Sequence, residues 1–452
     1  MSFIIQLVDF ITTPFGFIVI ITGLFVVVQA NQNRPRLGWL VIAVLGFAAS
    51  LGKFSNEFIK EPPSLVFPLE QICQQGRSLT IVLLLLLIII ALKSRNIWRK
   101  KLVPQPIIYI ILVQLTIFVK ILVYGDIGLA FLTAVTFGAV VFSLILGPSR
   151  WLQNEHNFQL GVWAMAMVGV IFGIANIYQA SIDPYPITFI HGWFLGTTGN
   201  PQMAALVITG VIPCLFFLAF QDQENRLLRL IWAGFLALAV FGLLMTASRT
   251  GAIMAVVSIL IFFRYRGGQF LQIALIFAVL AALFLPYLSP TDIESIGSFS
   301  KDTNTRAGVW GGYWQMFLDY PIFGAPFQGD RLRFGESSWL GALGSLGIIG
   351  GLPMFMFAWS TLDMIIKLDR ISKIRPDYYL KCSVVMAGLL SLLVGGISEA
   401  YLLGNLTFSV MAVFLYLILG NYIIEVVQQE YEYFKSQYYQ NYSNLQTNDV
   451  QM

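Results

Sequence analysis

The stretch LTIVLLLLLIIIAL (residues 79–92) carries no charged side chain and is most of the length that a helix needs to cross a bilayer. Runs of the same kind cover residues 107–119 and 230–245. Of the 452 residues, 57% are hydrophobic and only 11% are charged, whereas soluble domains carry roughly a quarter charged residues. The mean hydropathy is correspondingly high, at +0.77. The chain is therefore predicted to be a polytopic membrane protein.

These runs predict helices, because the strands of a closed barrel would alternate over segments of roughly ten residues instead. We expect an all-α fold with about 12–13 transmembrane helices. The expected spans are 11–30, 37–51, 78–92, 104–123, 127–147, 160–179, 201–220, 229–246, 250–263, 269–287, 339–362, 382–397 and 406–425. If residues 1–30 make no complete crossing, the number is twelve and every later loop keeps its side.

The distribution of lysine and arginine indicates the orientation. The basic connections are 33–36, 93–101, 149–150, 224–229, 264–266 and 367–381. Placing them in the cytoplasm puts most of the 27 Lys and Arg inside and leaves the N-terminus outside. Residues 1–427 are expected to form a single transmembrane domain. The polar, tyrosine-rich residues 428–452 are expected to form a flexible cytoplasmic tail.

Two predicted outer connections, 180–200 and 288–338, are long enough to suggest a functional role. The second contains RAGVWGGYWQMFLDYPIFG (306–324), whose apolar spacing predicts an amphipathic helix at the membrane interface. The apolar side chains expected on one face are Val309, Tyr313, Met316 and Phe317. Pro321 and Gly324 are expected to end this helix.

Four arginines and one carboxylate are the main charged candidates for site residues on the predicted outer side of the membrane. Arg249 lies in the turn TASRTGA (246–252), Arg306 opens the interfacial helix, Arg331 and Arg333 follow it, and Glu336 precedes a span. Structural interpretations are also open. Arg249 could cap the end of the preceding span or extend to the interface, and the loop arginines could be solvated charges. Glu336 could stabilise the first turn of the following helix.

Further candidates lie on the same predicted side. His191 and Asn200 belong to the loop before span 201–220, Arg77 begins span 78–92, and Glu399 follows span 382–397. His191 could equally be a structural histidine. Trp310, together with other tryptophans of this face, could belong to an interfacial belt instead of binding a sugar.

Taken together, the arginines and Glu336 suggest an anion site with a base beside it. The planar guanidinium of arginine matches phosphate oxygens in a bidentate manner. A charge held at membrane depth costs roughly 2.5–3.5 kcal/mol, which favours a compensating anion. At the outer face of a bacterial membrane, a lipid diphosphate is the natural amphiphilic anion.

Several other function classes find no support in the sequence. It contains no nucleotide-binding loop, zinc motif or Ser-His-Asp pattern. Cys73, Cys214 and Cys382 are scattered, so they imply no disulfide framework or metal cluster. The net charge of +4 reflects membrane topology and gives no argument for nucleic acid. We expect no cofactor and no metal, with the energy for the chemistry coming from the phosphate leaving group.

Four motifs carry a resemblance to a known family. They are GNPQMAALVITGVIP (199–213), TASRTGA (246–252), TRAGVWGGYWQMFLDYPIFGAPF (305–327) and ESSWLGALGSLGIIGGL (336–352). In this order, and separated by these spans, they resemble the O-antigen ligase and polymerase superfamily, the Wzy-type bacterial glycan transferases. The resemblance covers residues 195–400. It implies a GT-C-like membrane glycosyltransferase architecture, no metal ion, and an undecaprenyl-diphosphate-linked glycan as donor.

The resemblance also implies residue roles. Arg249 matches the arginine of the family's Ser-Arg-Gly turn, although Thr250 intervenes before Gly251 here. Arg306 matches the arginine that stands four residues before the family's tryptophan, here Trp310. Both arginines would hold the diphosphate and stabilise its charge as the glycosyl bond breaks. The Gly-Asn-Pro element of the family is matched at Asn200.

The departure from the family concerns the base. Ligases carry a His-Asn pair where this chain has Glu336-Ser337. A carboxylate can still take a proton from an attacking sugar hydroxyl, and Glu-Ser at this place is more similar to polymerases of exopolysaccharide or O-antigen repeats. We therefore expect a polymerase at the bacterial inner membrane with its active site facing the periplasm. A ligase acting on a lipid A-core or protein acceptor is the alternative, and a small-solute transporter is a third hypothesis.

The expected site follows from these arguments. The expected catalytic residues are Glu336, Arg249 and Arg306, and the expected substrate-binding residues are Arg331, Arg333, Asn200, His191, Arg77 and Trp310. The expected partners are the lipid-linked glycan donor, a glycan or lipid acceptor, and chain-length regulator and flippase proteins.

Overall fold

The computed structural model describes most of the chain, and every regular element in the described part is a helix. The described residues are 13, 16, 18–19, 21–23, 25, 35–52, 65–94, 103–124, 127–188, 192–221, 226–265, 267–268, 306–326, 336–404 and 406–449. All statements below concern these residues. The all-α prediction is confirmed for them.

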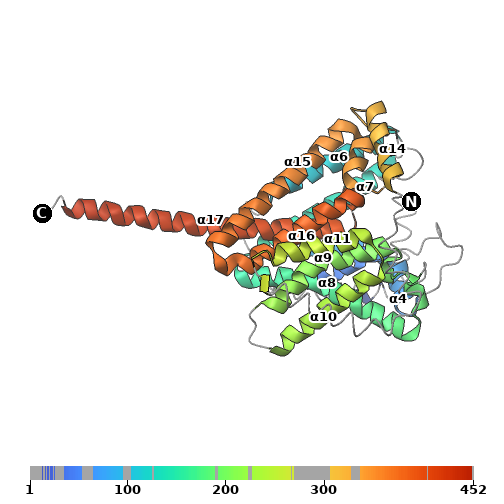
Figure 1. Ribbon diagram of the computed structural model, residues 1–452, viewed down its shortest axis with the longest axis horizontal. Helices are drawn as coiled ribbons and strands as arrows, with labels where there is room; N and C mark the ends of the chain where they lie inside the picture. Colours follow the sequence, from blue (N-terminus) through green and yellow to red (C-terminus); the bar gives the residue numbers. More distant parts are fainter. Residues whose placement is uncertain are drawn as a thin grey trace.

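The helices follow the chain in the order shown by the colours of Figure 1. The α-helices are α3 (Pro35–Ser50), α4 (Leu69–Gln74), α5 (Gly76–Lys93), α6 (Gln105–Tyr124), α7 (Ile127–Trp151), α8 (Glu155–Ile182), α9 (Pro201–Phe220), α10 (Arg226–Met245), α11 (Arg249–Phe262), α14 (Arg306–Asp319), α15 (Ser338–Ile374), α16 (Tyr379–Ser398) and α17 (Phe408–Asp449). Short 3₁₀ turns are η2 (Tyr185–Ile187), η4 (Gly196–Thr198), η7 (Pro376–Tyr378) and η8 (Tyr401–Leu403).

Nine helices in the described ranges are long and apolar enough to cross a membrane, and α3 and α11 are shorter apolar helices. Each predicted span between residues 37 and 263, and each between 339 and 425, coincides with a helix. Span 269–287 and most of span 11–30 lie outside the described residues. The chain is thus a multi-pass membrane protein, and its orientation in the membrane stays a prediction.

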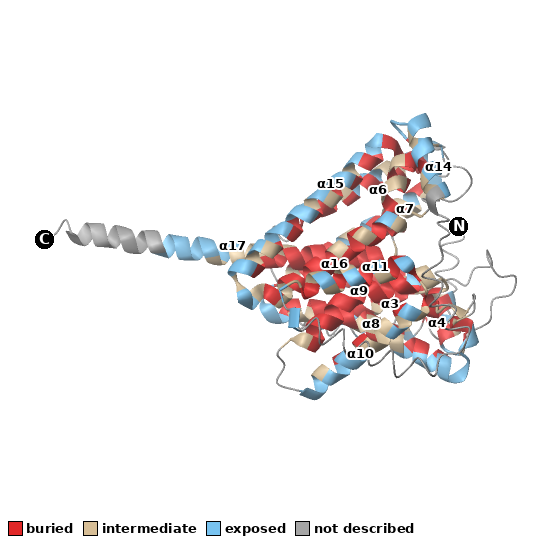
Figure 2. Ribbon diagram, viewed as in Figure 1, coloured by how far each residue is buried: buried red, intermediate tan, exposed pale blue. Residues whose placement is uncertain are grey.

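Helix α9 lies at the centre of the bundle. In its apolar segment 89% is buried inside the bundle, whereas in that of α10 only 17% is buried. Helix α10 therefore lies at the periphery and presents most of its surface outward. Figure 2 shows the buried residues concentrated on α9, α11 and α16, while α6 and α15 form one side of the molecule. Small residues permit close packing of these helices, because a Cβ on Gly388 of α16 would lie 2.4 Å from the Tyr416 ring of α17.

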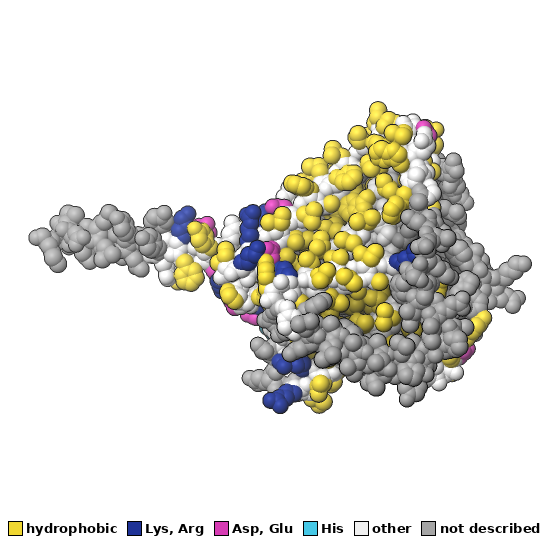
Figure 3. All heavy atoms as spheres, in the orientation of Figure 1, with side chains coloured by type: hydrophobic (Ala, Val, Ile, Leu, Met, Phe, Trp, Pro, Cys, Tyr) yellow, Lys and Arg dark blue, Asp and Glu magenta, His cyan; other side chains and the backbone are white. Residues whose placement is uncertain are grey.

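Charged and apolar side chains occupy different zones of the surface. Figure 3 shows hydrophobic side chains over the middle of the bundle and Lys, Arg, Asp and Glu gathered where α17 leaves it. At this end Arg375 pairs with Glu430 at 2.6 Å, and Arg264 pairs with Asp369 at 2.9 Å. An apolar band bounded by charged groups is the surface that a bilayer requires.

Helix α17 extends well beyond the bundle (Figure 1). The polar residues from 428 onward, expected to form a flexible tail, continue this helix to Asp449. Their glutamates, glutamines and lysine are good helix formers, so the helix needs no break where the apolar segment ends.

Helix α15 is broken at Gly347, whose φ of 62° and ψ of −158° lie outside the helical region. The break frees backbone groups that hydrocarbon cannot satisfy. The segment 321–325, here called the strap, supplies their partners. The Ile348 N–H donates to the Pro321 carbonyl at 2.8 Å, and the Ala325 N–H donates to the Gly344 carbonyl at 2.9 Å. The strap therefore connects α14 by hydrogen bonds to the N-terminal part of α15.

Two glycines make this approach possible. A Cβ on Gly347 would lie 2.3 Å from the Ile322 carbonyl oxygen, and a Cβ on Gly324 would lie 2.4 Å from the Leu346 nitrogen. Both glycines also have positive φ, a region that other residues rarely adopt. A side chain at either position would separate the strap from the break.

Lys120 of α6 completes this connection. Its Nζ donates to the carbonyl oxygens of Phe323 at 2.8 Å and Ala325 at 2.6 Å, and also to that of Ser345. The side chain is buried, with 5% of its surface exposed. An ammonium has three N–H donors, so these three carbonyls match its full capacity. Lys120 thus joins α6, the strap and the break in α15.

Replacing Lys120 by methionine should lower the free energy of unfolding by about 1–3 kcal/mol or more, because buried carbonyls lose their donor. The measurement is the apparent melting temperature of the purified protein in detergent micelles. Lys93→Met provides the control, since Lys93 is exposed in the last turn of α5. Equal melting temperatures for the two variants would contradict a stabilising role for Lys120.

Candidate functional site

The turn that contains Arg249 starts helix α11. Ser248 is its N-cap, and the Ser248 Oγ accepts a hydrogen bond from the Gly251 N–H at 3.2 Å. Ala247 has a positive φ of 51°, which redirects the chain after α10 ends at Met245. Arg249 is therefore the exposed first residue of α11. A helix N-terminus carries partial positive charge, so the backbone and the guanidinium both favour an anion at this place.

Glu399 connects this turn to helix α16. It follows the last residue of α16 and is buried, with 6% of its surface exposed. The Thr250 hydroxyl lies 3.4 Å from Glu399 Oε1, as donor, and 3.0 Å from the Ser398 Oγ. The carboxylate of Glu399 thus lies beside the residue that follows Arg249.

The same glutamate connects to the start of α15. The Ser338 N–H and Oγ donate to the backbone carbonyl of Glu399 at 3.2 and 2.6 Å. Ser337 is the N-cap of α15, and its Oγ accepts from the Leu340 N–H at 3.3 Å. Glu336 immediately precedes this cap. The turns that carry Arg249 and Glu336 therefore lie on either side of Glu399, at one end of the bundle.

The charge of Glu399 also affects Tyr401 in η8. Burial of the Tyr401 side chain, and then the negative charge of Glu399, raise the pKa of Tyr401 well above its ordinary value. The Tyr401 hydroxyl donates to the Leu392 carbonyl of α16. Tyr401 thus remains protonated and holds η8 against α16, which keeps the end of α16 in place.

Helix α14 brings Tyr313 close to Glu336. Burial, and then the negative charge of Glu336, raise the pKa of Tyr313 above its ordinary value. A Cβ on Gly344 of α15 would lie 2.8 Å from both the Tyr313 ring and its carbonyl oxygen. The four residues expected on one apolar face do not share one environment, because Tyr313 is buried while Met316 is 41% exposed.

Trp310 lies one turn before Tyr313 on α14. Its indole nitrogen is buried and has no hydrogen-bond partner among the residues that the structure describes. An indole N–H is a donor only, and a buried donor without an acceptor is costly. Arg306, four residues earlier, begins α14, so this spacing places the two on one helix face.

Asn200 and Arg77 lie near the same end of the bundle. Asn200 is the N-cap of α9, and its side chain accepts from the Gln202 N–H at 2.8 Å. A Cβ on Gly251 would lie 2.7 Å from the Ala205 Cβ, so the first turns of α9 and α11 are in contact. Arg77 is exposed on the first turn of α5. The structure gives Asn200 a capping role and leaves Arg77 on the surface.

Three expected site residues lie outside the described residues. They are His191, Arg331 and Arg333. For Arg306 the structure describes the backbone alone. The described part of the site therefore comprises Arg249, Glu336, Trp310, Asn200 and Arg77.

Two further residues belong to this region by geometry, although no role was predicted for them. Glu399 was recognisable only as an acid next to a span, and nothing in the sequence indicates that it contacts two other helices. Tyr313 was expected on the apolar face of its helix, and its burial against Gly344, where the charge of Glu336 reaches it, depends on the packing of α14 on α15.

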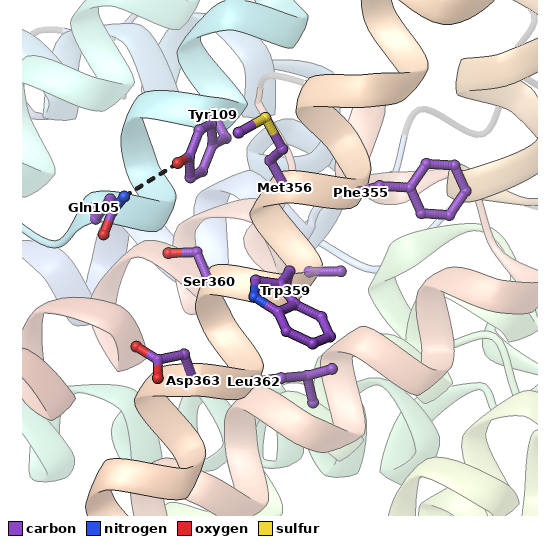
Figure 4. Close-up of a pocket in the computed structure, with 9 residues that line it drawn as sticks. Gln105, Tyr109, Phe355, Met356, Trp359, Ser360, Leu362 and Asp363 are labelled. Atoms are coloured by element: carbon purple, nitrogen blue, oxygen red, sulfur yellow. Dashed lines mark hydrogen bonds between the residues drawn. The ribbon is translucent and has the colours of Figure 1, made fainter.

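A cavity of about 640 Å³ lies away from these turns, between α6 and α15. Figure 4 shows its lining, where Gln105 Nε2 donates to the Tyr109 hydroxyl at 3.1 Å and Trp359 and Asp363 come from α15. Gln105 begins α6, whereas Lys120 is near its other end. Asp363 forms an ion pair with Lys367 at 2.6 Å. This cavity is thus separate from the turns around Glu399.

In the described ranges, no group of three or more His, Cys, Asp or Glu residues has the arrangement of a metal site. No family model matches this chain, and no curated protein matches its sequence.

Proposed function

We propose that this chain is a glycan polymerase of surface polysaccharide. It would transfer an undecaprenyl-diphosphate-linked glycan onto a sugar hydroxyl of the next lipid-linked repeat, at the outer face of a bacterial inner membrane. The proposal depends most on one observation: the turn of Arg249 and the turn of Glu336 are both held by Glu399 at one end of the bundle. The N-terminus of α11, which favours an anion, and the carboxylate of Glu336 are the two groups that this reaction needs.

In the proposed reaction, Arg249 and Arg306 hold the diphosphate of the donor. The acceptor hydroxyl oxygen attacks the anomeric carbon, and Glu336 takes the proton of this hydroxyl. The bond from the anomeric carbon to the phosphate oxygen breaks, and its electron pair leaves with the lipid diphosphate. Arginines at the diphosphate stabilise the charge that develops on it.

The remaining candidates would contribute to binding. Trp310 offers an indole N–H that can donate to a sugar or phosphate oxygen. His191, Arg331 and Arg333 are proposed to surround the glycan or the diphosphate on the outer side, and Arg77 and Asn200 to border this site. Chain-length regulator and flippase proteins are the proposed partners. The reaction as written requires no cofactor.

The break in α15 is the observation that would favour a transporter, since transporters often bind substrate at broken helices. Its exposed backbone groups already have partners, however, in the strap and in Lys120. The break therefore supports a rigid attachment of α14 better than a substrate site.

Deleting the gene in its host should leave only single-repeat glycans, because chain extension requires the polymerase. The measurement is the length ladder of the surface polysaccharide on a gel, with the wild-type gene restored as control. A ligase would give a different result, with long chains remaining on the lipid carrier and none on the acceptor. An unchanged ladder would contradict both glycan-transfer functions.

A further inference from the structure

A cavity of about 230 Å³ lies between α8, α9 and α10. Apolar side chains form most of its wall, among them Phe172, Val211 and Leu238. Gly242 borders open space, since a Cβ there would be only in ordinary contact with Ile208, at 3.4 Å. Because α10 is mostly exposed, this cavity lies at the periphery of the bundle.

Two polar side chains, Asn176 and Thr188, line the cavity, and the Thr188 hydroxyl already donates to the Pro184 carbonyl at 2.8 Å. Asn176 is 5% exposed, and its Nδ2 donates to the Phe172 carbonyl at 2.7 Å. This bond sets the orientation of the amide. Its Oδ1 is buried and accepts no hydrogen bond from the described residues. A buried acceptor favours an occupant that brings a donor, either its own or that of a water bound with it.

The lining of the cavity ends at Met245, four residues before Arg249. Met245, the last residue of α10, lines the cavity and accepts a hydrogen bond from the Phe194 N–H at 2.8 Å. The chain then passes directly through Thr246 and Ser248 to Arg249. An anionic headgroup at Arg249 would therefore lie only four residues along the chain from the lining of this cavity.

We propose that the cavity binds the first part of the hydrocarbon tail of the lipid diphosphate whose headgroup lies at Arg249. The proposal rests on the proposed function for the identity of that headgroup. Charge complementarity at Arg249 and the apolar wall select an anionic lipid, and a water held in the cavity beside the tail donates to Asn176 Oδ1. Burial of the chain adds binding free energy in proportion to its apolar area.

The test uses the full-length protein in nanodiscs and an undecaprenyl diphosphate analogue with a photoreactive group near the diphosphate. We expect labelling of peptides that contain residues 172–180 of α8 and 238–245 of α10. Ala239→Phe fills the cavity and should reduce this labelling by about tenfold or more. Gly242→Leu is an independent filling variant in case the first does not fold. Leu230→Phe is the matched control, because Leu230 lies on the exposed face of α10.

Two outcomes would overturn the tail site. Undiminished labelling in both filled variants is one of them. The other uses photoreactive phosphatidylglycerol as the probe and unlabelled undecaprenyl diphosphate as the competitor. If the phosphatidylglycerol labels the same peptides and the competitor does not reduce this labelling, the occupant is ordinary bilayer lipid. Binding is measured without transfer, so Glu336→Gln should retain the label. An unchanged glycan ladder in the deletion strain together with the expected labelling would reject the polymerase and leave the tail site standing.

Discussion

Replacing Arg249 by lysine should reduce glycan transfer by about a hundredfold or more, as expected when one preorganised donor to a developing charge is lost. Lysine keeps the positive charge at the N-terminus of α11 but loses the planar pair of donors that matches a phosphate. The Ser248 cap is unaffected, so α11 should still form. The measurement is polymer formation from purified lipid-linked repeats by the protein in proteoliposomes.

The control for this variant is Arg226→Lys, because Arg226 is exposed at the opposite end of the predicted crossing, where α10 begins. This control should retain full activity. Both variants should insert and melt like the wild type, since neither guanidinium is buried in the core. Full activity of Arg249→Lys would show that bidentate binding of the diphosphate is not its role.

Glu336→Gln should lower transfer by about two to four orders of magnitude, the range typical of a lost general base. The amide has nearly the same shape as the carboxylate but cannot accept the proton of the attacking hydroxyl. Donor binding should persist, because the proposed diphosphate ligands are unchanged.

Glu432→Gln is the matched control, because Glu432 is exposed on the part of α17 that leaves the bundle. It should leave the rate of transfer unchanged. Glu399→Gln adds a comparison, since its buried side chain accepts from Thr250, whereas its backbone carbonyl would still accept from Ser338. Normal turnover of Glu336→Gln would exclude it as the base and direct attention to His191 or Glu399.

The membrane-crossing helices could be predicted closely from the sequence. Helices α5, α6 and α10 begin and end within a few residues of their hydrophobic runs, because a run of this length without charge is stable only as a helix in hydrocarbon. Helix α14 could be predicted as well, since the apolar residues before Pro321 recur with helical spacing and a proline cannot continue the helix.

The break in α15 could not be predicted. Its sequence contains Gly341, Gly344, Gly347, Gly350 and Gly351, and any of them permits a departure from helical geometry. The choice of Gly347 depends on the strap and on Lys120, which are distant in the chain and satisfy the freed backbone groups at this position.

By itself, the sequence determined which segments are helices in a membrane, because the free energy of placing a segment in hydrocarbon is a sum over its own residues. It also supplied the candidate arginines and Glu336. Only the tertiary structure decided that the turns of Arg249 and Glu336 are held by the same glutamate, Glu399. That arrangement depends on hydrogen bonds and packing between helices far apart in the chain, and no local property of either segment specifies its partner.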